Sequence, residues 1–475
     1  MERSEFKIVV CGGGLAGQMT VAALVQALRA PYKVVHIDDC AGTQSELLYG
    51  SVTAPTAYDF LLTLGLDEQL LFTKTNTSFS FGSQYLNWPS APRDWVQAHH
   101  QPFALIGGVP LPHHLTRLQQ ELGPLLISGE AARQGRFAHP PEDKAHPLSR
   151  AEYGYQFDPD AWSDALRRQL AGGNVERIAG TLDAVETRDD VITALRLTDG
   201  HRITGDLYID CTGPLRQVLQ ALDIAFASER TIAVWRDVQA LSQLGPACRR
   251  IEASASGWSA QTFLQDSVHV LTVSDAHSAG DETCYMLGRV AQAWTGNCLA
   301  IGLSASLHDP ISPAPMAMLQ RDIERLMSLI PVGDEASMER SEFNRRFAED
   351  YANVSMFGAA FYSNDAPTED PFWTEALAAA QSPDLRRKRT QFESRGLLVK
   401  YDLEPFNDED WAILFLGLGV LPSRYDQQAD ALTREETAQH LETMRRAVSN
   451  VVPRMPPHHV YVANMKRYFE KQKYA

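Results

Sequence analysis

The stretch FKIVVCGGGLAGQMTVAALVQALRAPYKVVHIDDC, from Phe6 to Cys40, decides the fold. It reads as an apolar strand over Lys7 to Val10, a glycine turn, a helix from about Ala16 to Arg29 and a second strand that ends at Asp38. A strand, a helix and a strand in this order predict a βαβ unit that begins a parallel sheet.

The glycine turn has the spacing Gly-x-Gly-x-x-Gly, with Gly12, Gly14 and Gly17 between the strand and the helix. The first glycine permits the tight turn, the second lets the backbone approach a pyrophosphate, and the third lets helix and strand pack closely. The positive end of the helix, at Leu15 and Ala16, then faces the phosphates. Asp38 follows about 20 residues later, where a carboxylate accepts hydrogen bonds from ribose hydroxyls. We therefore predict a dinucleotide site; the alternative is a merely structural tight turn.

Two later segments favour FAD over NAD as the dinucleotide. GHRITGDLYIDCTGPLRQ contains an acidic turn, an apolar strand through Asp210 and a small-residue end at Gly213, as in the returning strand of many two-domain FAD enzymes. GNCLAIGLSASLHDP is a strand and a loop with Gly302, and it leads into an amphipathic helix. The chain has no second complete Gly-x-Gly-x-x-Gly, so no separate nicotinamide site is indicated, although NAD(P)H can bind without that motif.

The remaining patterns complete the fold class. Residues 175–205 alternate in short runs with Asp-Asp and Asp-Gly turns, which predicts a β-meander, and the last third of the chain is mostly helical in pattern. We predict an α/β protein with a Rossmann-like FAD-binding domain, a β-sheet substrate region and a helical C-terminal region. The predicted boundaries are 1–60, 150–215 and 290–330 for the discontinuous FAD-binding domain, 61–149 and 216–289 for the substrate region, and 331–475 for the helical region.

Composition limits the classes of partner. The chain has 475 residues, 44% hydrophobic and 21% charged, and a formal net charge of −16, which argues against nucleic acid or an anionic membrane as partner. The six cysteines are scattered without a Cys-x-x-Cys pair, so we expect reduced core cysteines and no metal site. No run approaches the ~18 apolar residues of a membrane span, and no signal peptide is recognisable, so we expect a cytoplasmic protein.

Several segments together resemble one family, the flavin-dependent tryptophan halogenases, over nearly the whole chain. These segments are CGGGLAGQMTVAAL, YLNW, YGYQFDPDAW, GDLYIDCTG, GNCLAIGLS, NRRFAEDY, DPFW and PFNDEDWAILFLGLGVLPSRYDQQADAL. The resemblance implies an FAD domain like that of flavin monooxygenases, capped by a helical region with an aromatic substrate pocket. It also implies a chemistry in which reduced FAD and oxygen form a hydroperoxide that oxidises halide, and the hypohalous species reaches a lysine, assisted by a glutamate, beside an indole.

The family's lysine position, counted back from Trp88, is Ser80 in this chain. Serine cannot form a haloamine or present an ammonium group to a hypohalous acid. Lys74 is close in sequence, but it would need a local shift to take the lysine's place.

The family's substrate pocket and flavin wall also differ here. The Trp-x-Trp-x-Ile-Pro wall keeps only its first residue, Trp258, for which core packing is the alternative role. The His-x-Phe pair that sandwiches the indole keeps Phe103, while Gln101 stands at the histidine position. The resemblance thus places Ser80, Gln101, Phe103 and Trp258 around a modified aromatic pocket.

The family's glutamate aligns with Ser312, and its halide is held by backbone N–H groups just after that residue. Here Pro313 and Pro315 occupy this region on either side of Ala314, and proline has no N–H to donate. Proline is also common at a helix start, where the backbone N–H groups have no intrahelical partner. The prolines can therefore both suit the start of the helix and remove donors from a halide site. We expect Ser312 and Ala314 to lie on a cofactor-facing turn that has lost its halide site.

These differences argue against halogenation and favour an FAD-dependent oxygenase that acts on an indole or a similar electron-rich aromatic. A narrower hypothesis comes from a branch of halogenase-like flavoproteins that oxygenate a tryptophan of a partner protein during cysteine tryptophylquinone biogenesis. His308 and Asp309 are candidate polar groups beside the flavin that could assist proton transfer, although a loop histidine is often only structural.

Two alternative functions stay open. One is a true halogenase with relocated residues, which could use Lys74. The other is a noncatalytic FAD-binding assembly factor. Because the second dinucleotide motif is missing, we expect either a separate flavin reductase or a partner-derived reductant to supply electrons.

Overall fold

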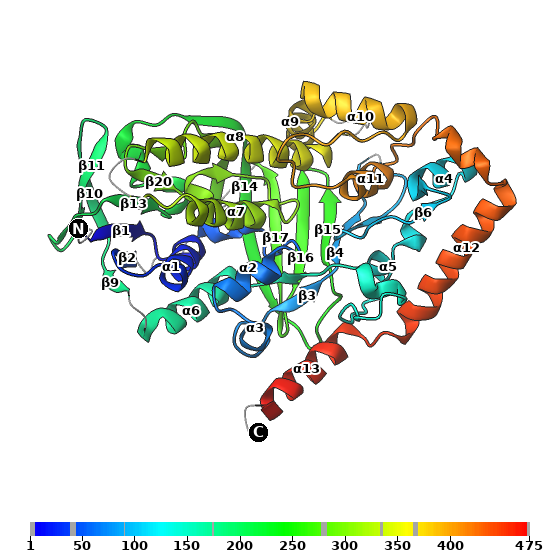
Figure 1. The fold of residues 1–475 in the computed structure, drawn as a ribbon, viewed down its shortest axis with the longest axis horizontal. Coiled ribbons are helices and arrows are strands. Elements are labelled where there is room, and N and C mark those ends of the chain that lie inside the picture. The colour runs from blue at the N-terminus through cyan, green and yellow to red at the C-terminus, as the bar shows by residue number, and fades with distance from the viewer. Residues whose placement is uncertain are drawn as a thin grey trace.

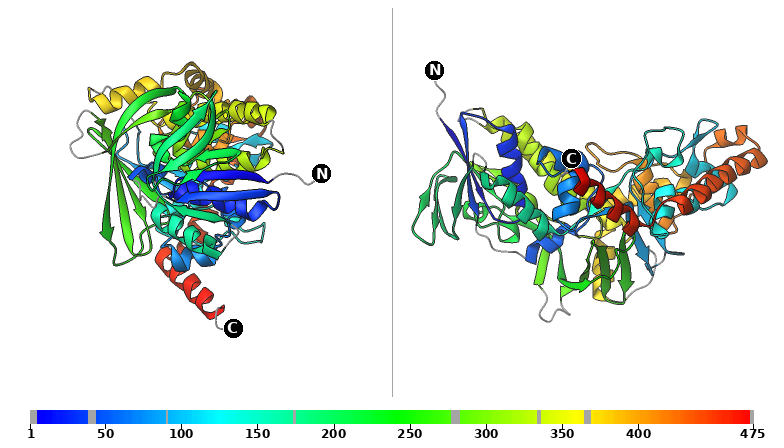
Figure 2. Two further views of the ribbon diagram at one scale, coloured as in Figure 1. Left: turned by 90° about the vertical axis from the view of Figure 1, so that its left-hand side faces the viewer. Right: turned by 90° about the horizontal axis from the view of Figure 1, so that it is seen from below.

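The computed structural model describes residues 5–38, 44–89, 91–172, 175–276, 283–332, 336–363 and 369–472. Figure 1 shows three parts side by side: the first strands and their helices at the left, long central strands, and helices at the right. Figure 2 shows the same arrangement from the side and from below, with the C-terminal helix extending away from the central strands.

The predicted βαβ unit is confirmed at the centre of a six-stranded sheet within the described ranges. β1 pairs in parallel with β2 and with β13, β13 with β20, and β2 with β9. The strand order is β19 (Trp294–Thr295), β20 (Cys298–Ala300), β13 (Leu207–Asp210), β1 (Phe6–Cys11), β2 (Tyr32–Asp38) and β9 (Glu176–Ala179). The segment through Asp210 therefore does return beside the first strand, as its sequence predicted.

Helices cover this sheet because its strands are apolar along most of their length and need shielding on both faces. Helix α1 (Leu15–Ala27) is buried continuously from Leu15 to Leu24, as expected for a helix that is apolar all round. It lies between α6 (Pro159–Gln169) and α7 (Ala314–Ser328). The long helix α8 (Ser337–Ala360) packs on α7 (Figure 1).

The second large element is a mostly antiparallel eight-stranded sheet in the described part of the chain. Its order is β21 (Ser306–Leu307), β18 (Thr283–Val290), β14 (Phe226–Ala240), β17 (Ser267–Asp275), β16 (Gly257–Phe263), β15 (Arg249–Ser254), β4 (Gly82–Leu86) and β5 (Trp95–Ala98). Only the β15–β4 pair within it is parallel. β21 comes directly before the loop that leads to α7, so this sheet reaches the loop with the prolines.

Smaller elements complete the fold. The predicted meander is confirmed as β10 (Leu182–Arg188), β11 (Val191–Leu197) and β12 (Arg202–Ile203). Two short pairs join β3 (Ser78–Ser80) to β8 (Gly154–Gln156) and β6 (Leu105–Ile106) to β7 (Val109–Pro110). The other N-terminal helices are α2 (Ala57–Thr63), α3 (Glu68–Lys74), α4 (Leu111–Leu118) and α5 (Ile127–Arg133).

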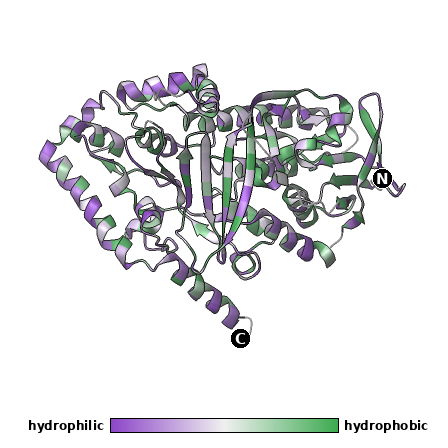
Figure 3. Ribbon diagram, turned by 180° about the vertical axis from the view of Figure 1, so that it is seen from behind, coloured by the Kyte–Doolittle hydropathy of each residue, from purple (hydrophilic) through white to green (hydrophobic). Residues whose placement is uncertain are grey.

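The last third is helical, as predicted. Its helices after α8 are α9 (Pro371–Ala379), α10 (Pro383–Arg395), α11 (Asp408–Gly417), α12 (Arg434–Val451) and α13 (His458–Gln472). Figure 3 shows that the peripheral helices α10 and α12 are largely hydrophilic, which fits their place at the edge of the molecule. No helix in the described ranges is long and apolar enough to cross a membrane. The predicted division into three regions stays a prediction.

The prediction that the cysteines belong to the core holds for most of them. Cys11, Cys211, Cys248 and Cys298 are buried free thiols. Cys284 is a free but exposed thiol, because it lies near the start of β18 on the outer side of the large sheet, so the prediction was wrong there. Cys40 lies outside the described residues.

Candidate FAD site and the loop before helix α7

The glycine turn between β1 and α1 lines a small cavity. Gly12 has a φ of +128°, and a Cβ there would lie 2.3 Å from the carbonyl oxygen of Cys211. A Cβ at Gly17 would lie 1.9 Å from the carbonyl oxygen of Gly12, so this glycine allows the close packing of helix and strand. The cavity is lined by Gly12, Gly13, Gly14, Ala16, Glu46, Tyr49, Cys211, Thr212, Gly213 and Leu303.

The lining of this cavity fits the phosphate end of a dinucleotide. Backbone of the glycine turn and of Thr212 and Gly213 surrounds the N-terminus of α1, where the helix dipole stabilises an anion. The Leu15 amide donates a hydrogen bond of 3.2 Å to the carboxylate of Glu46, so an anionic oxygen already lies at this helix end.

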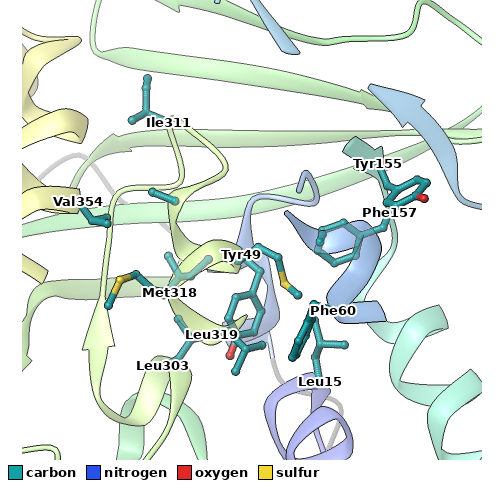
Figure 4. Packing of buried hydrophobic residues seen from close by; sticks show 14 of the residues in the cluster. Leu15, Tyr49, Phe60, Tyr155, Phe157, Leu303, Ile311, Met318, Leu319 and Val354 are labelled. Carbon is teal, nitrogen blue, oxygen red and sulfur yellow. The ribbon is translucent and has the colours of Figure 1, made fainter. Parts of the chain in front are cut away.

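Two cavity residues, Glu46 and Tyr49, carried no recognisable sequence signal. Both belong to the short 3₁₀ segment η1 (Gln44–Tyr49). Tyr49 is buried, its hydroxyl lies 2.7 Å from where a Cβ at Gly302 would be, and burial raises the pKa of the phenol well above its usual value. In Figure 4 its ring lies among Leu15, Phe60, Leu303 and Leu319, so it forms an apolar wall between α1 and α7.

Asp38 is at the end of β2, as predicted, and it already has protein partners. Its Oδ2 accepts hydrogen bonds from Arg167 Nε at 3.1 Å and from Gln18 Nε2 at 3.4 Å. Arg167 also donates to the carbonyl oxygen of Gly13 at 2.9 Å. The guanidinium thus ties the carboxylate predicted to bind ribose to the glycine turn, across a separation in sequence that no local pattern could indicate.

Asp210 organises the turn that carries Gly213. It is fully buried, and its carboxylate accepts from the Thr212 amide and hydroxyl and from the amides of Val218 and Leu219, at 2.6–3.0 Å. Gly213, with a φ of +73°, is thereby held in the cavity wall. The structure gives Asp210 a positioning role behind the cofactor cavity.

Gly302 is similarly anchored from behind. It has a φ of +62°, and its amide donates at 3.0 Å to Asp322 of α7. Asp322 also accepts from Arg325 at 3.0 Å, and Arg325 in turn pairs with Asp350 of α8. Burial raises the pKa of Asp322 to about 6, although Arg325 and the Gly302 amide oppose the shift.

The loop from His308 to Pro313 is fastened by a buried cation, Arg249 of β15. Its Nη1 donates to the carbonyl oxygen of Gly50 at 2.8 Å, and its Nη2 donates to those of Pro310 and Ile311 at 2.8 and 2.7 Å. Tyr85 of β4 also donates to the Ile311 carbonyl at 2.8 Å. Burial lowers the pKa of Arg249 to about 10, which still leaves it charged at neutral pH.

Asp309 is held by a second set of contacts, one from the same sheet and one from the segment that follows α8. Its Oδ2 accepts from Arg230 of β14 at 2.5 Å and from the Tyr362 hydroxyl at 2.8 Å. The Trp258 indole N–H donates to that hydroxyl at 2.8 Å. Trp258 is completely buried in β16, so its role is in the core, as the anchor of Tyr362.

His308 is buried next to Asp309 in sequence, but its side chain contacts different residues. Its Nε2 lies 3.2 Å from the Ser306 hydroxyl, and its ring lies 4.8 Å from that of Tyr351 in α8. Burial lowers the pKa of His308 to about 3. The imidazole is therefore neutral at neutral pH and can act only as a neutral donor or acceptor.

The backbone amides near Ser312 are few. Residues 310–315 include three prolines, the Ile311 amide donates to Asp309 at 3.1 Å, and the Ala314 amide donates to the Ser312 hydroxyl at 3.3 Å. Only the Ser312 amide then remains as a donor in this segment. Because Pro313 precedes α7 and Pro315 stands in its first turn, the prolines also suit the helix start.

Ser80, at the position of the family's lysine, is packed inside β3. It is 0% exposed, its hydroxyl donates to the Gly82 carbonyl at 3.0 Å, and it accepts from the Gly82 amide at 3.2 Å. Lys74 ends α3 with an exposed side chain. Lys388 is buried, but it pairs with Glu404 at 2.8 Å beneath Trp411 and Tyr401, and both members of the pair are closed to solvent.

The two residues of the predicted indole sandwich are half-buried beside helices α5 and α11. The Gln101 side-chain oxygen accepts from Ser128 at 3.3 Å, and the Phe103 amide donates to Glu409 at 3.3 Å. Ser80 and Trp258 are fully buried, in contrast to these two. The four predicted pocket residues thus differ in access, and the two that are open to a ligand are Gln101 and Phe103.

The fold and the glycine cavity define a flavin-dependent enzyme, and comparison with known proteins gives its family. Residues 7–434 match the tryptophan halogenase family, and the chain belongs to it. Tryptophan 6-halogenase ThaL from Streptomyces albogriseolus is 26% identical over 488 residues, which cover 87% of this chain and 90% of ThaL.

Solved structures agree with this assignment. BrvH, a flavin-dependent halogenase from Brevundimonas sp. BAL3, has a TM-score of 0.88 at 25% identity and covers 98% of this chain and 99% of its own. Xcc4156, a flavin-dependent halogenase from Xanthomonas campestris, has a TM-score of 0.88 at 24% identity, with 97% and 98% covered. The cofactor of this family is FAD, and the glycine turn, Thr212 and Gly213 are the residues that would hold its phosphates.

Proposed function

We propose that this protein is an FAD-dependent oxygenase built on the tryptophan halogenase fold, that it does not halogenate, and that it oxygenates an indole-type aromatic. The observation that carries the proposal is the loop at 310–315, whose three prolines and two internally bonded amides leave one backbone donor at Ser312. A halide ion needs several hydrogen-bond donors to replace its hydration shell, because burying an anion without such partners costs roughly several kcal/mol.

The position of Ser80 supports the same proposal. Halogen transfer in this family needs an ammonium group beside the substrate, and Ser80 is buried and bonded to Gly82. The Lys74 side chain is exposed whereas Ser80 is fully buried, and the Lys388 ammonium is paired with Glu404.

Bound and reduced, FAD would supply the activation of oxygen, and the chain's own residues position the reactants. The contacts of Arg249 and Tyr85 fix the backbone at Ile311, and those of Arg230 and Tyr362 fix Asp309. A rigid loop of this kind keeps water out and holds a substrate in one orientation. We further propose that neutral His308, which lies 3.2 Å from the Ser306 hydroxyl, contributes to this loop only as a hydrogen-bond donor or acceptor.

The substrate class rests on the half-buried pair Gln101 and Phe103, since an aromatic ring packs well on Phe103 and the Gln101 amide can bond its polar edge. A free indole is the simpler substrate, and a tryptophan in a partner protein, as in cysteine tryptophylquinone biogenesis, is the narrower hypothesis. A separate reductase is proposed as the source of reduced flavin.

The test is to supply the protein with reduced FAD, ¹⁸O₂ and a set of indoles and tryptophyl peptides, without halide, and to analyse products by mass spectrometry. Labelled oxygen in an indole product supports the proposal, and a labelled peptide favours the narrower hypothesis. Product that forms only when bromide is added would support the halogenase alternative, which family membership favours. Peroxide alone, with no oxygenated product, would support the noncatalytic FAD-binding alternative.

A further inference from the structure

Three titratable side chains form a relay where the C-terminal helix α13 contacts α3, and both helices lie at the lower edge of Figure 1. The Tyr461 hydroxyl and His139 Nδ1 lie 2.6 Å apart, and His139 Nε2 lies 3.4 Å from Glu68 Oε1. A phenol, an imidazole and a carboxylate in this order resemble a proton donor, its base and the group that orients the base. None of these three described residues lines the glycine cavity, and the proposed oxygenation makes no use of them.

Glu68 is held in its ionised form. Its Oε1 also accepts hydrogen bonds from the hydroxyls of Tyr153 at 3.0 Å and Tyr155 at 2.9 Å. Burial alone would raise the pKa of Glu68, but the contacts with His139, Tyr155 and Tyr153 outweigh it and leave the pKa below its usual value. An ionised carboxylate only accepts, so the hydrogen-bond network assigns the proton of neutral His139 to Nε2. Nδ1 is then left as the acceptor of the Tyr461 proton.

Packing holds the Tyr461 phenol against this base. Its ring centre lies 5.3 Å from that of Phe137 and 6.0 Å from that of Phe79, and the His139 amide also donates to its oxygen at 3.4 Å. Burial raises the pKa of Tyr461, so the phenol keeps its proton at neutral pH. Both Tyr461 and His139 are only half-buried, so a small molecule in solution can approach the pair.

A phenol beside a free base loses an electron more easily than an isolated phenol, because the phenol cation is a very strong acid and its proton can leave in the same step. When Tyr461 loses one electron, its O–H bond breaks and the proton forms an N–H bond at His139 Nδ1. Tyr461 becomes a neutral radical, and the imidazolium pairs with the Glu68 carboxylate, so no charge is left without a partner. The neighbouring rings of Phe79 and Phe137 are much harder to oxidise and cannot take over the radical.

We propose that Tyr461 is a redox-active tyrosine, which gives one electron to a peroxyl radical while its proton passes to His139. The peroxyl radical gains the electron and, with a proton from water, becomes a hydroperoxide. Ascorbate or a thiol in solution then returns one electron to Tyr461, and His139 returns the proton. Reduced flavin and oxygen give reactive oxygen species as by-products, so this pair would protect a protein of this family from them. The inference does not depend on whether the protein oxygenates or halogenates a substrate.

The test uses the full-length protein loaded with oxidised FAD, without substrate, and hexachloroiridate(IV) as a one-electron oxidant. A Cys284→Ser parent is used because the exposed thiol would consume the oxidant. Rapid mixing and freezing, followed by electron paramagnetic resonance, should show a tyrosyl radical in the parent and none in Tyr461→Phe. His139→Gln keeps a hydrogen-bond acceptor but cannot hold the proton, so oxidation of Tyr461 should slow by about 100-fold. The FAD content of each variant checks that it is folded.

Tyr468→Phe is the matched control. Tyr468 is on the same helix and 57% exposed, and its hydroxyl accepts a hydrogen bond from Gln472 Nε2 at 2.6 Å, but no base beside it is recorded in the described part of the chain. The control should keep the full radical signal. A parent without a tyrosyl signal, or a signal that survives Tyr461→Phe or disappears in Tyr468→Phe, would overturn the assignment to Tyr461. An unchanged oxidation rate in His139→Gln would overturn the role of the base.

Discussion

The Arg249 guanidinium donates a hydrogen bond of 2.7 Å to the carbonyl oxygen of Ile311, and both groups are buried. The same guanidinium holds Gly50, which directly follows the cavity residue Tyr49, so one cation joins the two segments beside the cofactor cavity. Its three partners are neutral carbonyls, which explains why burial lowers its pKa. This contact makes the loop before α7 a fixed wall.

Arg249→Met should therefore loosen both segments. Three buried carbonyls would lose their donor, and we expect the free energy of unfolding to fall by about 2–4 kcal/mol. FAD affinity should fall as well, and denaturant titration and flavin fluorescence measure the two effects. Arg249→Lys keeps the positive charge but lacks the several N–H donors of the guanidinium, so it should recover only part of each loss. If Arg249→Met is as stable as the wild type, Arg249 does not have this role.

Substitutions of Ser80 test whether the lysine position is closed. Ser80→Ala loses the hydrogen bonds with Gly82 and should cost about 1 kcal/mol of unfolding free energy. Ser80→Lys places an unpaired ammonium in the core and should cost about 3 kcal/mol or more. Equal stability of the two variants in urea denaturation would show that space and solvent for a lysine exist there.

Glu46 should weaken cofactor binding through charge repulsion, because its carboxylate lies at the N-terminus of α1, where the FAD phosphates would bind. Glu46→Gln keeps the size and removes the charge, so FAD should bind about three- to tenfold more tightly at low salt. Glu46→Asp, which retains the charge, is the control and should show no such gain. Weaker binding by the glutamine variant would mean that the carboxylate itself contacts the cofactor.

Asp322 should make stability depend on pH in a defined direction. Burial raises its pKa to about 6, so between pH ~4 and ~6 the folded protein holds a proton that the unfolded chain releases. The contribution of this residue to the free energy of unfolding therefore increases as pH falls through 6, by at most about 1.4 kcal/mol per pH unit. Thermal or urea unfolding of Asp322→Asn at several pH values should lack this contribution. Parallel pH curves for the variant and the wild type would disprove it.

The local parts of the fold could be predicted because their causes are local. Strand, turn and helix around Gly12, Gly14 and Gly17 follow from apolar runs and a fixed glycine spacing, and the structure has them at nearly the predicted bounds. The prolines at residues 313 and 315 could be assigned to a helix start because the helix begins directly beside them. Both patterns lie within a few residues of the structure they determine.

The residues that hold the site together could not be predicted, because each acts on a distant segment. Arg249 is one arginine in an ordinary strand pattern, and its partners near residues 50 and 310 meet only in the folded chain. Tyr49 and Glu46 reach the cofactor cavity from a short segment with no periodic pattern. Trp258, for which the sequence left two roles open, is fully buried, and its indole N–H donates to Tyr362.

Bromide dependence is the decisive measurement for the loss of halogenation. The purified protein would receive reduced FAD, oxygen and bromide together with a small-molecule trap for hypobromous acid, and brominated trap and peroxide would be measured against reduced FAD alone. We expect peroxide or oxygenated product and no bromination above the level of free reduced FAD. Bromination above that level would contradict the loss of the halide site at residues 310–315 and restore the halogenase function.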